Sequence, residues 1–110
     1  YDVVHGISHA LLLPSVMRYN LPQCEAKMAV IGRIIVGGRL ESDAATAVAG
    51  IEALERFREE IGLPARLREV LPDNTMLPKM SRNAANDICL LTNPRPAGWK
   101  DILNIYYGAW

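Results

Sequence analysis

The two histidines of the sequence are the residues whose type and spacing best suit chemistry. His5 and His9 stand four positions apart near the start of the chain. On a helix, side chains at i and i+4 share one face, so both imidazoles can reach a single metal ion. Asp2 and Glu25 are the nearest carboxylates, and neither has a spacing typical of a third ligand. Two imidazoles do not complete a metal site, and a polar helix end is the alternative interpretation.

The two cysteines, Cys24 and Cys89, do not form a C-x-x-C motif. A free cysteine is most often a small buried apolar side chain, so neither position predicts a reactive thiol. The sequence also lacks the G-x-x-x-x-G-K-[ST] phosphate loop and the G-x-G-x-x-G dinucleotide fingerprint. The residues by themselves therefore indicate no complete active site.

Composition limits the class of protein. The chain has 110 residues, of which 50% are hydrophobic, and its formal net charge is zero, as in a single globular domain. The balanced charge predicts no nucleic-acid partner and no anionic membrane partner. No apolar run approaches the roughly 20 residues of a membrane span. Two cysteines are too few for a disulfide framework and indicate a cytoplasmic protein.

The hydrophobic pattern is helical nearly throughout and predicts an all-α bundle of five or six helices. Val30–Val36 is the only β-rich stretch, and it continues a helical pattern. We expect helices over about residues 6–19, 22–36, 43–61, 77–91 and 99–107, with a single turn at 66–71.

Several residues should shape these helices. Pro14 should kink the first helix, and Asn20 should end it. Ser42 or Asp43 should cap the third helix. The second helix is apolar on most sides around Val30–Val36, which predicts a central place in the core.

The stretch His5–Asn20 resembles the PHG…A-x-LLP-x-VM-x-YN segment of iron-containing (group III) alcohol dehydrogenases. Further matches follow in family order at Gly62-Leu63-Pro64, Leu67-Arg68, Leu77-Pro78, Ala84, Asp87, Asn93-Pro94-Arg95, Asp101-Ile102 and Ile105-Tyr106. The start also resembles the family's upstream H-G-x-x-H segment, but the unbroken continuation through Ala10–Asn20 favours the first alignment. The resemblance implies that residues 1–110 are the carboxy-terminal portion of the helical metal-binding domain. That domain is part of a dehydroquinate synthase-like fold, and the Rossmann-like nucleotide-binding domain is absent from this chain.

The resemblance also implies roles for individual residues. In that family one Asp and three His bind Fe(II), or Zn in some members, and His5 falls on one ligand position. The other three ligands are expected upstream, and Val4 replaces the usual Pro. His9 falls where the family usually has Asn, so it receives no ligand role, although it could lie near the metal and the substrate pocket. Cys89 falls on a position that lines the cofactor and substrate cleft in some members, with plain burial as the alternative.

The implied activity is hydride transfer between NAD(P) and a small alcohol or aldehyde, with the metal as Lewis acid. We expect this chain alone to be inactive, because it carries one implied ligand and no nucleotide-binding domain. A maleylacetate reductase-like member of the superfamily and a free-standing helical interaction module are the alternatives. Helices separated from their neighbours expose apolar surface, so we expect a homo-oligomer formed through Val30–Val36.

Overall fold

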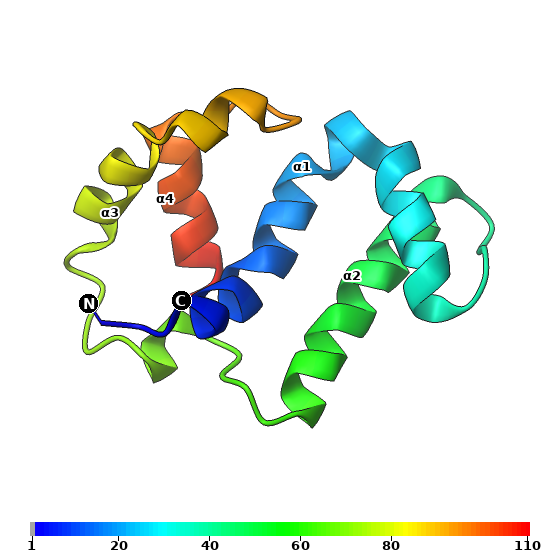
Figure 1. The fold of residues 1–110 in the computed structure, drawn as a ribbon, viewed down its shortest axis with the longest axis horizontal. Coiled ribbons are helices and arrows are strands. Elements are labelled where there is room, and N and C mark those ends of the chain that lie inside the picture. The colour runs from blue at the N-terminus through cyan, green and yellow to red at the C-terminus, as the bar shows by residue number, and fades with distance from the viewer. Residues whose placement is uncertain (1) are drawn as a thin grey trace.

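The computed structural model describes residues 2–110, and this part of the chain has four α-helices, two short 3₁₀ helices and no strand. The elements follow in the order α1 (His5–Val36), α2 (Asp43–Glu60), η1 (Leu67–Glu69), α3 (Leu77–Ala84), η2 (Ile88–Thr92) and α4 (Trp99–Gly108). Helix α2 packs along α1, α3 packs against α4, and α4 contacts α1 (Figure 1). The predicted all-α fold is confirmed. No helix within residues 2–110 combines the length and the apolar character that a membrane crossing needs.

Helix α1 corrects the prediction of two helices separated at Asn20. Its backbone keeps helical angles at Pro14 and Asn20 and leaves them at Cys24, where φ is −144° and ψ is 31°. Pro22 explains a bend in this place, because it offers no N–H to the carbonyl of Arg18 and its ring crowds that carbonyl. The bent α1 replaces two of the predicted helices, so four α-helices stand where five or six were expected.

The second half of α1 does not lie in the core, which corrects the prediction that it is central. Val30 is 51% exposed and Ile34 is 78% exposed, whereas Ala29 and Gly32 are buried against α2. The molecule is only 18 Å thick along its shortest axis, which is less than two helix diameters. This half of α1 packs on α2 with one side, and its open side carries the exposed side chains of Val30, Ile31, Ile34, Ile35 and Val36.

Helices α1 and α2 touch through two glycines. A Cβ added at Gly50 would lie 2.6 Å from the Cα of Gly32, and one added at Gly32 would lie 2.3 Å from the carbonyl oxygen of Thr46. Only hydrogen atoms fit in these spaces. Helix α2 begins as predicted, because the hydroxyl of its N-cap residue Ser42 accepts a hydrogen bond from the N–H of Ala45 at 3.0 Å.

Helix α3 ends at Ala84, which corrects the prediction of a helix continuing to Leu91. The carboxylate of Asp87 accepts the N–H of Cys89 at 2.8 Å and starts the separate 3₁₀ helix η2. Aspartate side chains compete in this way with helical backbone bonds. Ile88 and Leu91, which fall within the predicted helix, are 77% and 84% exposed.

The core lies where the first half of α1 meets η1, α3 and the end of α4. Its buried members are Leu11, Leu67, Leu71, Leu77 and Ala109. Leu11 belongs to α1 and the other four lie in or next to short elements later in the chain, so the cluster ties the carboxy-terminal half of the chain to α1. This packing holds the first turns of α1, which carry both histidines, against the rest of the domain.

Candidate functional site

His5 and His9 lie on the exposed first turns of α1, with their ring centroids 4.3 Å apart and tilted by 53°. The His9 Nδ1 lies 3.2 Å from the carbonyl oxygen of His5. A carbonyl only accepts, so the neutral His9 ring carries its proton on Nδ1 and keeps an Nε2 lone pair free. Imidazole nitrogens are suitable donors for Fe(II) and Zn(II). The predicted pair on one helix face is therefore present.

The imidazoles of His5 and His9 supply part of the ligand set that a metal site needs. Within residues 2–110, no group of three or more His, Cys, Asp or Glu side chains could hold a metal ion. Glu25 is on the same helix twenty residues beyond His5, which corresponds to about 30 Å at 1.5 Å per residue. Further ligands for an ion on His5 must therefore come from outside the described residues.

Cys89 lines an apolar cavity of about 290 Å³ between α1, η2 and α4. The cavity wall from α1 includes Leu12 and Val16, and α4 adds Tyr106. The Asp87 carboxylate next to Cys89 raises the pKa of the thiol, so the thiol stays protonated near neutral pH. Cys89 is exposed and not buried, which favours a lining role over the alternative of plain burial.

The histidines and the cavity share one face of α1. His5, His9, Leu12 and Val16 follow spacings of four, three and four residues, which place all four on one helical stripe. Leu12 and Val16 line the Cys89 cavity, and His9 precedes Leu12 by about 4.5 Å along the helix axis. The structure thus places the predicted metal ligand on the face that leads into the apolar cavity, although neither histidine belongs to the cavity wall.

A pair of asparagines holds this cavity together. The side-chain amides of Asn20 and Asn93 donate to each other's carbonyl oxygens at 2.9 and 2.8 Å, and Asn20 is 5% exposed. Arg95 donates to the carbonyl of Tyr19 at 2.9 Å and stacks on the Tyr19 ring at 4.2 Å. The Tyr19 hydroxyl donates to the carbonyl of Pro96 at 2.7 Å. These bonds fix the segment after η2 on α1, immediately before the bend.

Sequence reasoning missed the structural role of these residues. Asn93-Pro94-Arg95 entered as a family match, and Asn20 as a family match and a helix stop. Their pairing joins positions 73 residues apart in the chain, and no local pattern reports such a contact.

Residues 2–110 thus form an all-α domain that carries two exposed imidazoles on one face of α1. The chain belongs to the Fe-containing alcohol dehydrogenase family. The family model for the C-terminal part of these proteins matches residues 1–110.

Known proteins of the family resemble the chain over its whole length. It is 36% identical to lactaldehyde reductase of Escherichia coli (strain K12), covering 100% of the chain and 29% of that protein. NAD-dependent methanol dehydrogenase of Bacillus methanolicus is 32% identical, with 99% of the chain and 29% of the relative covered. The crystal structure of a 1,3-propanediol oxidoreductase superposes with a TM-score of 0.93 at 34% identity, over 100% of the chain and 29% of that structure. The chain thus spans less than a third of the length of these relatives.

Proposed function

We propose that residues 1–110 act as the carboxy-terminal portion of the helical metal-binding domain of an iron-type, NAD(P)-dependent alcohol dehydrogenase. In this proposal the nucleotide-binding domain is not part of the chain. The observation that carries it is the single α1 face on which His5 and His9 precede Leu12 and Val16, two residues of the Cys89 cavity. The family match over residues 1–110 supports the same assignment.

His5 would supply one ligand to Fe(II), or to Zn, and His9 would lie beside the metal without binding it. When bound, the ion supplies Lewis-acid polarisation of the alcohol or aldehyde oxygen, and NAD(P) supplies the redox step. The chain's own residues hold and orient the substrate. The protonated Cys89 thiol and the apolar walls exclude water from its carbon skeleton, and the Asn20–Asn93 pair fixes those walls.

A small alcohol or aldehyde is the substrate class that the cavity suits. Its volume of about 290 Å³ lies just below the roughly 300–1,000 Å³ usual for ligand pockets. Its lining is mainly apolar side chains, which suit a short carbon chain. The names of these relatives refer to lactaldehyde, methanol and 1,3-propanediol, which are all short molecules.

A chimeric enzyme tests this function. The chain would replace the matching segment of E. coli lactaldehyde reductase, with which it shares 36% identity. We expect the chimera to retain iron and to reduce lactaldehyde, and the His5→Ala variant to lose both properties. Asp2→Ala offers a matched control, because it removes a neighbouring exposed side chain to which no ligand role is given. An active His5→Ala chimera would refute the assignment.

We also propose that the open face of α1 packs against a second copy of the chain. The accessible surface of 6912 Å² is about 800 Å² more than the roughly 6,100 Å² expected for a monomer of 12.2 kDa. A standard interface buries about 800 Å² on each partner. Light scattering should therefore show a dimer or larger oligomer, and Ile34→Glu should yield a monomer. Ile88→Glu, which alters an equally exposed isoleucine elsewhere, should leave the oligomer intact. A monomeric wild-type chain at high concentration would contradict the proposal.

A further inference from the structure

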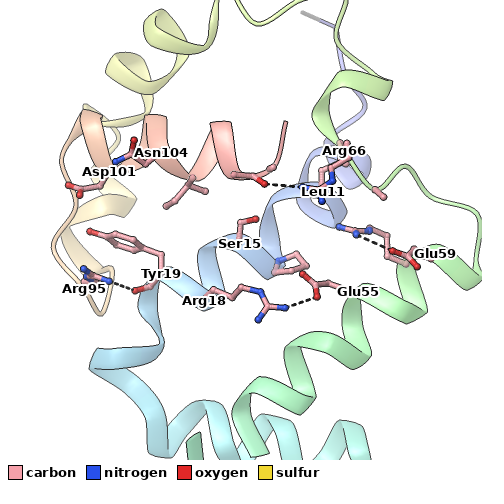
Figure 2. Close-up of a pocket in the computed structure, with 16 residues that line it drawn as sticks. Leu11, Ser15, Arg18, Tyr19, Glu55, Glu59, Arg66, Arg95, Asp101 and Asn104 are labelled. Carbon is pink, nitrogen blue, oxygen red and sulfur yellow. Dashed lines mark hydrogen bonds and ion pairs between the residues drawn. The ribbon is translucent and has the colours of Figure 1, made fainter. Parts of the chain in front are cut away.

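A second and larger cavity lies between α1, α2 and α4, with a volume of about 730 Å³ (Figure 2). It shares only Tyr19 and Ile105 with the Cys89 cavity, and neither histidine lines it. Its wall is rich in charge, with the arginines Arg18, Arg58, Arg66 and Arg95 and the acids Glu55, Glu59 and Asp101. Four positive charges face three negative ones, so the lining carries a net positive charge.

Most of these charged groups already have strong partners. Arg18 and Glu55 form an ion pair at 2.6 Å. Arg95 is held by the Tyr19 carbonyl and ring. The Asp101 carboxylate accepts the N–H of Gly98 at 2.8 Å, where it caps α4. These groups are therefore held in place and shape the wall of the cavity.

Arg58 is the exception. Its side chain is only 11% exposed, and its nearest carboxylate oxygen, on Glu59, lies 3.9 Å away. Its Nη1 reaches the carbonyl of Ala10 at 3.5 Å, which is the limit of a hydrogen bond. That carbonyl is available because Pro14, four residues later, has no N–H to offer it.

The Nε of Arg58 is buried and has no hydrogen-bond partner in the part of the chain that the structure describes. A guanidinium carries five N–H donors, and a buried charge without acceptors is costly. Buried polar groups of this kind almost always have a partner, which can be a bound ion. Arg58 lines the cavity and its Nε–H has no partner among the described residues, so its guanidinium has hydrogen-bonding capacity left for a ligand.

We propose that this cavity binds a small oxyanion, a molecule that presents a carboxylate or phosphate group to Arg58 and Arg66. Arg66 is exposed on the cavity wall and uses Nη1 to donate to the carbonyl of Gly108 at 3.1 Å, which leaves its other donors available. Guanidinium groups bind carboxylate and phosphate in a bidentate manner, and two of them bring enough charge to offset Glu59. The site is separate from the proposed metal and substrate site, and does not depend on it.

Calorimetric titration of the protein with sodium phosphate, and separately with sodium acetate, tests the proposal at constant ionic strength. We expect saturable binding of at least one of the two anions, and their relative affinities distinguish a phosphate from a carboxylate ligand. Arg66→Gln should weaken binding by about tenfold or more, as expected for loss of one charged hydrogen bond. Arg58→Gln should abolish binding, and circular dichroism would report whether that variant still folds.

Arg56→Gln is the matched control, because Arg56 is exposed on the same helix and does not line the cavity. It removes the same charge and should leave the affinity unchanged. Absence of saturable binding for both anions would overturn the proposal. Equal weakening by Arg56→Gln and Arg66→Gln would also overturn it, since only general charge attraction would then hold the anion.

Discussion

Replacement of Gly50 by Ala should destabilise the domain, because this residue sets the contact between α1 and α2. The added Cβ would lie 2.6 Å from the Cα of Gly32, whereas ordinary carbon contacts begin near 3.5 Å. The atom it meets is backbone and cannot rotate aside. The two helices must therefore separate by several tenths of an ångström or more around Ala29, Ala47 and Ile51, which are at most 1% exposed.

The magnitude follows from two opposing effects. Alanine favours a helix over glycine by about 1 kcal/mol, which stabilises the variant. An extra methyl group in an already filled helix contact costs about 1–3 kcal/mol. Gly50→Ala should lie at the upper end of this range, because the new methyl group meets backbone and no side chain can move aside. We expect a net loss of about 2 kcal/mol in the free energy of unfolding. At about 4 °C per kcal/mol for a domain of this size, the Tm should fall by about 8 °C.

Thermal and urea unfolding followed by circular dichroism measure this change. Gly6→Ala on α1 is the control, since its Cβ would meet no atom within 4 Å and its stability should stay the same or rise slightly. Gly32→Ala should be more damaging than Gly50→Ala, because its Cβ would meet a carbonyl oxygen at 2.3 Å. If Gly50→Ala were as stable as the wild type, the inference of direct backbone contact would be wrong.

Three further results are expected. Asn93→Ala leaves the buried amide of Asn20 without its partner and should lower stability by about 1–3 kcal/mol in urea unfolding, whereas Asn86→Ala, an exposed control, should change it little. The N–H of Cys89 lowers the pKa of Asp87 below 3.8, so the stabilisation from its carboxylate is present above that pH and is lost as the pH falls through the lowered pKa. The stability difference between wild type and Asp87→Asn should therefore shrink on acidification below pH 3.8, and a constant difference would contradict this cause. The 110-residue chain mixed with NAD and primary alcohols should form no NADH by absorbance, and clear turnover would show that it holds a complete site.

Local signals were enough to predict the helices that begin with a strong cap. The predicted Ser42 cap starts α2. The start of α4 at Trp99 was predicted without a cap, and in the structure the N–H of Gly98 donates to the Asp101 carboxylate there. The bend at Cys24 was not predicted, because Pro22 acts two residues before the position where the backbone leaves the helix. The end of α3 was missed because Asp87 competes for a backbone N–H, and an apolar stripe carries no information about that competition.

The site was predictable only in its local part. The spacing of His5 and His9 by itself predicts two imidazoles on one face, and the structure shows this arrangement. The cavity depends on contacts between distant segments, such as the Asn20–Asn93 pair, which a periodicity analysis does not detect. The exposure of Val30–Val36 was missed for a related reason. A helix that is apolar on every side predicts packing neighbours on every side, but its sequence does not show whether this chain supplies them.

Iron analysis of the purified chimera is the most direct test of the central claim, which is that His5 is a metal ligand. The measurement compares wild type, His5→Ala and His9→Ala after exhaustive dialysis. Stoichiometric iron should remain in the wild type and in His9→Ala, and should be lost from His5→Ala. Full retention of iron by His5→Ala would contradict the account.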